Sequence, residues 1–245
     1  MEVLRPLASL VLPGKCFDSI LLDWNFGDAA CLKLALSKCL GYGMILGGSL
    51  VKLPQILKIL NAKSATGLSV AAVISDLAGV TATTAYSFAQ KFPFSAYGEG
   101  AFLMLETALI LLLALHYQGR TLMAAVFALI YFTACFISFS DTLPMGILWW
   151  GQVLAAPTVI SGKLWQAREN FYAGHTGQLS MITMSLLLLG CLARIFTSIT
   201  ETNDQIMILS YGFAALANAL LVIQILIYWE ATDKITKTTS SKKKE

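Results

Sequence analysis

Charged residues are scarce in this chain. Asp, Glu, Lys and Arg make up only 13% of its 245 residues, whereas hydrophobic residues make up 57%. A soluble globular domain carries about a quarter charged residues and about 45–50% apolar ones. The apolar residues gather in blocks of about 20, the length of a helix that crosses a hydrocarbon core about 30 Å thick. The composition therefore excludes an ordinary soluble domain and predicts an all-α membrane protein.

Several chemical motifs are also missing. The sequence contains no Asp-x-Asp pair, no His-Glu-x-x-His motif and no nucleophile elbow, so we expect no enzyme, no cofactor and no bound metal. We expect no nucleic-acid partner either. The five cysteines show no Cys-x-x-Cys spacing, and we interpret them mainly as small apolar residues. A disulfide between Cys16 and Cys31 in an oxidising lumen is the alternative.

Seven apolar blocks predict seven transmembrane helices, because a backbone inside lipid must satisfy its own hydrogen bonds. The N-terminal run of apolar residues, 1–12, is too short to span a bilayer. Residues 1–36 are therefore expected to form a lumenal or interfacial segment, with a weakly ordered tail as the alternative. The seven predicted spans are 38–60, 68–89, 97–118, 122–140, 143–165, 178–199 and 205–229.

Basic residues are distributed unevenly between the two ends of these spans. With a lumenal N-terminus, ten lie on the cytosolic side, five on the lumenal side and two inside spans. The positive-inside rule therefore predicts a lumenal N-terminus and a cytosolic C-terminus. Lys243 and Lys242 stand three and four places from the end of this tail, as in a dilysine signal for retrieval to the endoplasmic reticulum. A solvated basic tail is the alternative.

An internal repeat is visible in two proline motifs. Pro54-Gln55 lies in the first predicted span and Pro157-Thr158 in the fifth, and each is followed by a Thr-Gly signature. Proline removes a backbone N–H and crowds the carbonyl four residues earlier, so each span should kink there. The kink is either static or a hinge that opens and closes the bundle.

The spacing within the two copies agrees with this repeat. Ser69 and Ser180 are 111 positions apart, and so are Gly79 and Gly190. Spans one to three and five to seven are therefore predicted to be two parallel three-helix repeats joined by one linker helix, a known transporter plan. The resulting organisation is an N-terminal segment 1–36, repeat 1 over 37–118, the linker helix 119–141, repeat 2 over 142–230 and a cytosolic tail 231–245.

Three longer stretches, 49–55, 174–180 and 192–199, carry a family resemblance. On these the chain resembles the PQ-loop (SWEET-like) superfamily, and within it the members needed for the use of dolichol-linked sugars. The resemblance covers nearly the whole chain. The second copy departs from the family pattern, because Pro157-Thr158 stands where a Pro-Gln pair is expected.

This resemblance implies a function and a set of partners. It implies an endoplasmic-reticulum membrane protein that lets dolichyl-phosphate mannose and dolichyl-phosphate glucose serve lumenal glycosylation, by flipping or presenting these lipids. The implied partners are dolichyl-phosphate-linked sugars, the lipid bilayer and glycosyltransferases of the endoplasmic reticulum. Two alternatives stay open: a passive or proton-coupled transporter of a small sugar or amino acid, and a scaffold for glycosyltransferases without transport.

Ionisable residues inside the spans are the first candidates for a binding site, because each costs about 2.5–3.5 kcal/mol on insertion scales. Lys52 and Asp76 each lie about 12 Å from the same end of neighbouring helices, so we expect an ion pair, either structural or gating. Arg194 suits a lipid phosphate, with pairing to Glu106 or Glu201 as the alternative.

Further candidates lie at mid-span and in loops. Glu106 and Asn218 occupy corresponding positions of spans three and seven, where they line one pocket or make interhelical hydrogen bonds. Three residues of cytosolic loops, Lys63, His175 and Gln178, are candidates for contact with lipid head groups.

Overall fold

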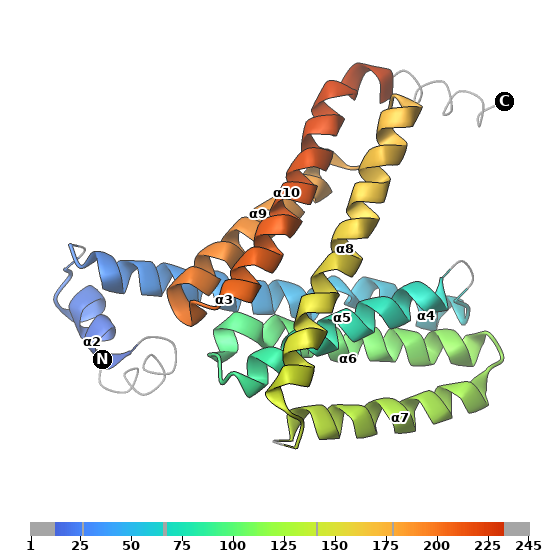
Figure 1. The fold of residues 1–245 in the computed structure, drawn as a ribbon, viewed down its shortest axis with the longest axis horizontal. Helices are drawn as coiled ribbons and strands as arrows, with labels where there is room; N and C mark the ends of the chain where they lie inside the picture. Colours follow the sequence, from blue (N-terminus) through green and yellow to red (C-terminus); the bar gives the residue numbers. More distant parts are fainter. Residues whose placement is uncertain (1–12, 26, 66–67, 141, 178, 233–245) are drawn as a thin grey trace. The chain divides into compact units, whose positions relative to one another are not determined.

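The protein is described by a computed structural model that covers residues 13–25, 27–65, 68–140, 142–177 and 179–232. Helices make up nearly all of this part of the chain (Figure 1), and two of its elements are π-helical turns, η1 and η2. In order, the elements are α2 (Gly14–Phe17), η1 (Asp18–Leu22), α3 (Ala29–Val51), α4 (Leu53–Ala62), α5 (Val70–Ala89), α6 (Phe94–Tyr117), α7 (Thr121–Phe139), α8 (Met145–Ala173), α9 (Met181–Thr197), η2 (Ser198–Thr202) and α10 (Gln205–Ile227).

The long helices match the seven predicted spans one for one, when α3 with α4 and α9 with η2 are each taken as one segment. Five segments are long and apolar enough to cross a membrane: Ala29–Ala62, Phe94–Tyr117, Thr121–Phe139, Met181–Thr202 and Gln205–Ile227. The other two, α5 and α8, are helices of 20 and 29 residues that carry more polar side chains. The all-α, multi-pass membrane class expected from composition is therefore confirmed.

Lipid contact is most evident on α7. Leu122, Leu129 and Phe136 on this helix are 73–79% exposed, although they are large apolar side chains. A helix with so much exposed apolar surface is unfavourable in water and stable in hydrocarbon. The protein is therefore in contact with the bilayer.

The first long helix begins earlier than the sequence predicted. It starts at Ala29 rather than at residue 38, because the Asp28 side chain accepts a hydrogen bond from the Cys31 backbone N–H at 3.1 Å and caps the helix. The sequence prediction left this first part outside the span because it contains one charged residue, Lys33, and is followed by another, Lys38.

A disulfide joins Cys16 and Cys31, 15 residues apart, and so links α2 to the first turn of α3. The interpretation of the cysteines as small apolar residues is therefore wrong for these two. Cys39, Cys135 and Cys191 form no disulfide within the described part of the chain. The predicted interfacial run, 1–12, lies outside the described residues.

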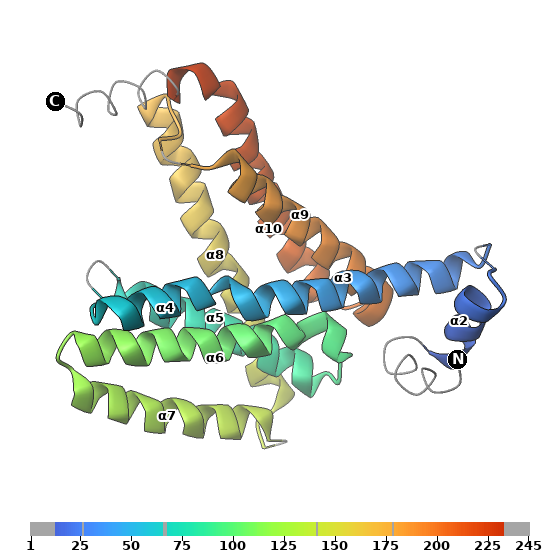
Figure 2. The same cartoon turned by 180° about the vertical axis from the view of Figure 1, so that it is seen from behind.

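Contacts divide the chain into two compact units. The first contains residues up to Ala155 together with Phe196–Asp204, and the second contains Ala156–Ile195 and the residues from Gln205 onwards. In the first unit α6 is the central helix and packs against α3, α4, α5 and α7 (Figure 2). The apolar core of this unit includes Ile56, Ile59, Ala65, Val73, Leu77, Ala108, Ile110, Leu111, Ala114, Leu115 and Ala124.

Two glycines allow the close approach of helices to α6. A Cβ atom on Gly41 of α3 would lie 2.6 Å from the Ser95 carbonyl oxygen, and one on Gly100 of α6 would overlap the Thr84 hydroxyl of α5. Small residues at such positions let backbones approach closely inside a membrane, where van der Waals packing drives helix association.

Within the second unit, α10 makes side-chain hydrogen bonds to both α8 and α9. Gln224 of α10 donates to the Ala167 carbonyl of α8 at 2.7 Å and accepts from the Asn170 side chain at 3.1 Å. Asn218 of α10 donates to Cys191 Sγ of α9 at 3.3 Å. The third helix of this set thus contacts both others, as α6 contacts α3 and α5 in the first unit.

The two proline motifs have different backbone structures. The first predicted span is broken at Lys52, and Pro54 falls in the first turn of α4, where its missing N–H costs nothing. This interruption lies two residues before Pro54, where the sequence predicts a kink. Pro157 instead lies inside α8, which runs from Met145 to Ala173 without interruption. The repeat signatures therefore do not produce equal breaks in the two copies.

Candidate functional site

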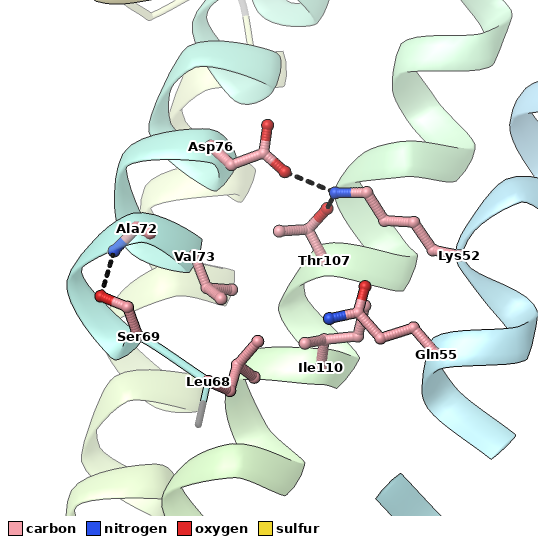
Figure 3. A pocket seen from close by; sticks show the side chains of 9 residues that line it. All are labelled: Lys52, Gln55, Leu68, Ser69, Ala72, Val73, Asp76, Thr107 and Ile110. Atoms are coloured by element: carbon pink, nitrogen blue, oxygen red, sulfur yellow. Dashed lines mark hydrogen bonds and ion pairs between the residues drawn. The ribbon is translucent and has the colours of Figure 1, made fainter. Parts of the chain in front are cut away.

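A polar pocket of about 290 Å³ lies in the first unit between α4, α5 and α6 (Figure 3). It sits beside the break between α3 and α4, where the Pro-Gln motif begins. The residues that line it are Lys52, Gln55, Leu68, Ser69, Ala72, Val73, Asp76, Thr107 and Ile110.

An ion pair crosses this pocket. Lys52 Nζ lies 2.5 Å from Asp76 Oδ2 and 2.5 Å from the Thr107 hydroxyl (Figure 3). Lys52 occupies the one-residue interruption between α3 and α4, whereas Asp76 and Thr107 are on α5 and α6. The expected pairing of Lys52 with Asp76 is therefore present, and it draws together the three helices of the first repeat.

The exposure of the two charges differs. The Lys52 side chain is 20% exposed and the Asp76 side chain 59%. Asp76 nevertheless lies on α5, a helix made largely of apolar residues. Its carboxylate must therefore face water, a polar ligand or another polar surface. The pocket is consequently open on the side of Asp76.

Gln55 and Ser69 add neutral polar groups. The Ser69 hydroxyl accepts from the Ala72 N–H at 3.3 Å and caps α5, so the helix places this oxygen at the pocket wall. The Gln55 side chain extends from α4 toward Ile110 (Figure 3). Within the described residues its amide makes no hydrogen bond, so both its donor and its acceptor are available.

Glu106 and Asn218 are both buried, at 8% and 2% exposure. Glu106 Oε2 and Asn218 Oδ1 have no hydrogen-bond partner among the described residues. A buried polar group without a partner costs free energy, so such oxygens mark places where a donor is missing. Glu106 lies in the first unit and Asn218 in the second.

The other predicted site residues are dispersed. Arg194 is 3% exposed within α9 of the second unit. Lys63 is exposed at the end of α4 with a left-handed backbone, φ 47°. His175 is half-buried, and its Nδ1 has no partner within the described chain. Three predicted candidates lie outside the described residues: Gln178, Lys242 and Lys243.

A second polar cluster escaped the sequence analysis. Glu201 of η2 forms an ion pair with Lys38 of α3 at 2.7 Å and accepts hydrogen bonds from Ser37 at 2.6 Å and from Ser95. Nearby, Asp204 accepts from the Tyr86 hydroxyl at 2.7 Å. These contacts join residues more than 100 positions apart, so no local sequence pattern could predict them.

Thr107 and Ser69 were also missed as pocket residues. Ser69 was visible only as the last residue of the Thr-Gly-Leu-Ser signature, and Thr107 only as the neighbour of Glu106. A capping serine directly before an apolar helix is a recognisable signal. The placement of Thr107 depends instead on how α6 packs against α5, which the sequence does not reveal.

Fold and pocket together define a class of protein: a multi-pass helical membrane protein with a polar pocket in a three-helix unit that is broken at a Pro-Gln motif. Residues 36–96 match the model of the PQ loop repeat family. The chain is also similar to human solute carrier family 66 member 3, with 27% identity over 178 residues, 73% of this chain and 87% of that relative. Both similarities support the PQ-loop superfamily inferred from the sequence.

Proposed function

We propose that this protein lets dolichyl-phosphate mannose and dolichyl-phosphate glucose serve lumenal glycosylation from the membrane of the endoplasmic reticulum. It flips or presents the lipids for transferases that build lipid-linked oligosaccharide and glycosylphosphatidylinositol anchors and that add O- and C-linked mannose. The proposal rests on the resemblance of stretches 49–55, 174–180 and 192–199 to the mannose-P-dolichol utilization defect 1 protein. No catalytic step is part of it.

The observation that carries the proposal is the Lys52–Asp76 pair inside the first repeat. A charged pair in an apolar helical bundle is costly, so membrane proteins retain such groups mainly along paths for polar cargo. Here the pair borders an open pocket of about 290 Å³ with further polar groups. A phosphate cannot cross hydrocarbon cheaply without such polar contacts.

The orientation proposed for this role is a lumenal N-terminus and a cytosolic C-terminus. The Cys16–Cys31 disulfide supports it, because disulfides persist in oxidising compartments such as this lumen. The distribution of basic residues supports it independently. With this orientation Lys242 and Lys243 stand at a cytosolic end, where a dilysine retrieval signal is read.

Other polar positions take supporting roles in the proposal. Glu106 and Asn218, each within its own unit, are further candidate acceptors for sugar hydroxyls, and their unpartnered buried oxygens support this role. Arg194 is a second phosphate contact. Lys63, His175 and Gln178 meet head groups at the cytosolic surface. Loss of lipid binding in Arg194→Lys, with normal expression, would support the phosphate role, and unchanged binding would contradict it.

The two proline motifs supply the motion that the proposal needs. Contacts divide the chain between Ala155 and Ala156, directly before Pro157-Thr158, so the division of units coincides with a proline inside α8. Pro54-Gln55 stands at the break between α3 and α4. We place hinges at both positions, because a backbone lacking a helical hydrogen bond bends most easily there.

A second candidate is a transporter for a small sugar or amino acid. The relative of similar length is named as a solute carrier, and a pocket of about 290 Å³ has the size for a single small solute. A scaffold for glycosyltransferases, without transport, is the third. It would leave the pocket residues without influence on glycosylation.

The deciding experiment is rescue of cells that lack the mannose-P-dolichol utilization defect 1 protein. Lipid-linked oligosaccharides are profiled after expression of this chain. Restoration of the sugars added in the lumen is the expected result. Persistence of the truncated species, with normal protein levels in the endoplasmic reticulum, would overturn the proposal and make solute uptake the leading candidate. Rescue by a variant without the pocket charges would favour the scaffold.

A further inference from the structure

We infer that the pocket between α4, α5 and α6 holds the head group of a glycosyl phosphate, with Lys52 on the phosphate and Asp76 and Gln55 on sugar hydroxyls. The inference deepens the proposed function and rests on it, because it names the site and the chemical group that each residue recognises. Four properties of the pocket lead to it: an open ammonium donor, an open carboxylate oxygen, a free amide and a matching volume.

Lys52 retains capacity for an anion. Its ammonium has three N–H donors, and two of them are engaged, with Asp76 and with Thr107. The third has no partner in the described part of the chain. Helix α5 begins at this pocket, with Ser69 as its N-cap, so the positive end of its dipole adds to the charge of Lys52. The surroundings of the ammonium therefore favour a phosphate.

Asp76 and Gln55 provide the complementary chemistry for a sugar. Only one Asp76 oxygen is engaged, with Lys52, so the other is open to hydroxyl donors. The Gln55 amide offers a donor and an acceptor, and each sugar hydroxyl can use both. Val73 of α5 and Ile110 of α6 also line the pocket and present carbon surface, against which the apolar face of a pyranose ring packs.

The pocket volume limits the ligand to a head group. About 290 Å³ lies at the lower end of the range of about 300–1,000 Å³ for drug-sized ligands. A single hexose with its phosphate fits such a volume, whereas a polyprenyl chain does not and stays in the bilayer. The ligand chemistry is thus a monosaccharide joined to a phosphate ester.

In the empty pocket, Lys52 and Asp76 neutralise each other and so replace the contacts that the ligand would make. Two unpaired charges in an apolar bundle would each be strongly destabilising, and their mutual contact of 2.5 Å avoids this. When the ligand enters, its phosphate takes over part of the contact with Lys52, and its hydroxyls take over part of the contact with Asp76. Both charges thereby stay satisfied in both states.

Binding by the purified full chain in lipid nanodiscs tests the inference. The probes are mannosyl phosphate joined to citronellol as a short lipid, citronellyl phosphate without sugar, mannose 1-phosphate and mannose. Wild type is expected to bind the mannosyl lipid best. A lipid-borne ligand requires that it bind more tightly than mannose 1-phosphate, and equal affinities would assign the site to a soluble sugar phosphate.

Three variants separate the residue roles. Lys52→Met should weaken all phosphate-bearing probes by about tenfold or more, because a charge-assisted contact is lost. Asp76→Asn should keep the affinity for citronellyl phosphate and lose about tenfold of the preference for the sugar-bearing lipid. Lys58→Met removes a charge from an exposed position of the same helix outside the pocket, and should bind like wild type.

The outcomes distinguish this inference from the proposed function. Wild-type affinity in Lys52→Met, or failure of wild type to bind any probe, overturns the inference even if cells are rescued. Binding that depends on Lys52, in a chain that fails to rescue cells, upholds the site and overturns the proposed function. The double variant Lys52→Met/Asp76→Asn leaves no lone charge, so its loss of binding with normal thermal stability excludes misfolding as the cause.

Discussion

Lys38 of α3 and Glu201 of the π-helical turn η2 form an ion pair of 2.7 Å, and the Glu201 side chain is only 1% exposed. Hydrogen bonds from Ser37 and Ser95 complete the surroundings of this carboxylate. The connection between α9 and α10 is therefore anchored by charge to α3 and α6.

Glu201→Gln should lower the thermal stability of the protein. It leaves the Lys38 ammonium, whose side chain is 14% exposed, without its counter-charge, and breaking a buried pair costs about 3–5 kcal/mol. The melting temperature in detergent micelles is the measurement. Glu169→Gln is the control, because its pair with Arg168 is exposed and worth about 1 kcal/mol or less. Equal melting temperatures for the two variants would contradict the prediction.

Gly41→Ala and Gly43→Ala should act in opposite directions. The new methyl group at Gly41 would meet the Ser95 carbonyl at 2.6 Å and force α3 away from α6, at a cost of about 1–3 kcal/mol. At Gly43 nothing lies within 4 Å, so alanine gains about 0.5–1 kcal/mol of helix stability. The measurement is the melting temperature of each variant relative to wild type. Similar shifts in the two variants would refute the close packing of α3 on α6.

Pro157→Ala should stabilise the protein and weaken its function. Alanine restores the hydrogen bond to the Val153 carbonyl inside α8, and an interior proline costs about 3 kcal/mol. A stiffer α8 then opposes the proposed hinge, so rescue of glycosylation should fall while the melting temperature rises. Pro54→Ala should change the melting temperature little, because Pro54 occupies the first turn of α4. Full rescue by a stabilised Pro157→Ala variant would exclude the hinge in α8.

Reduction of the Cys16–Cys31 bond should destabilise the protein by about 3 kcal/mol, the loop entropy expected for about 15 residues. Labelling of the unfolded protein with maleimide-polyethylene glycol measures the bond directly. Three thiols should react before reduction, namely Cys39, Cys135 and Cys191, and all five cysteines after it. Cys39→Ser serves as the control and should leave the melting temperature unchanged. Five reactive thiols before reduction would disprove the bond.

Glu106→Gln should separate stability from function. The buried Oε2 atom has no partner within the described residues, so exchange of the carboxyl group for an amide of equal size removes no contact. The melting temperature should stay equal or rise, whereas rescue of glycosylation should fall if this oxygen accepts a sugar hydroxyl. Glu230→Gln, at an exposed position, is the matched control. Undiminished rescue would exclude a role of Glu106 in sugar binding.

Sequence reasoning succeeded where the determinants are local. Apolar blocks of sufficient length located all seven helical segments of the described chain, and the interruption in the first of them lies two residues before Pro54. The Lys52–Asp76 pair was predictable because one short loop joins their helices and both residues lie equally far from it. A hairpin of two helices sets this register by itself.

Contacts between distant segments could not be predicted in this way. Glu201 was expected as a loop residue or as a partner of Arg194, and its contacts with Lys38 and Ser37 cross more than 160 positions. The sequence also did not predict that the backbone differs around Pro54 and Pro157. A proline can begin a helix or be held inside one by packing, and the sequence motif alone does not distinguish the two.

The disulfide at the start of α3 imposes an order on biosynthesis. The bond between Cys16 and Cys31 can form only after this part of the nascent chain has reached an oxidising compartment. Both cysteines precede α6 by more than 60 residues, so the bond can form before α6, the packing partner of α3, has been synthesised. Production in a host that leaves this segment in a reducing cytoplasm will therefore yield a protein without the bond, and a host that exports the segment to an oxidising compartment is the appropriate source.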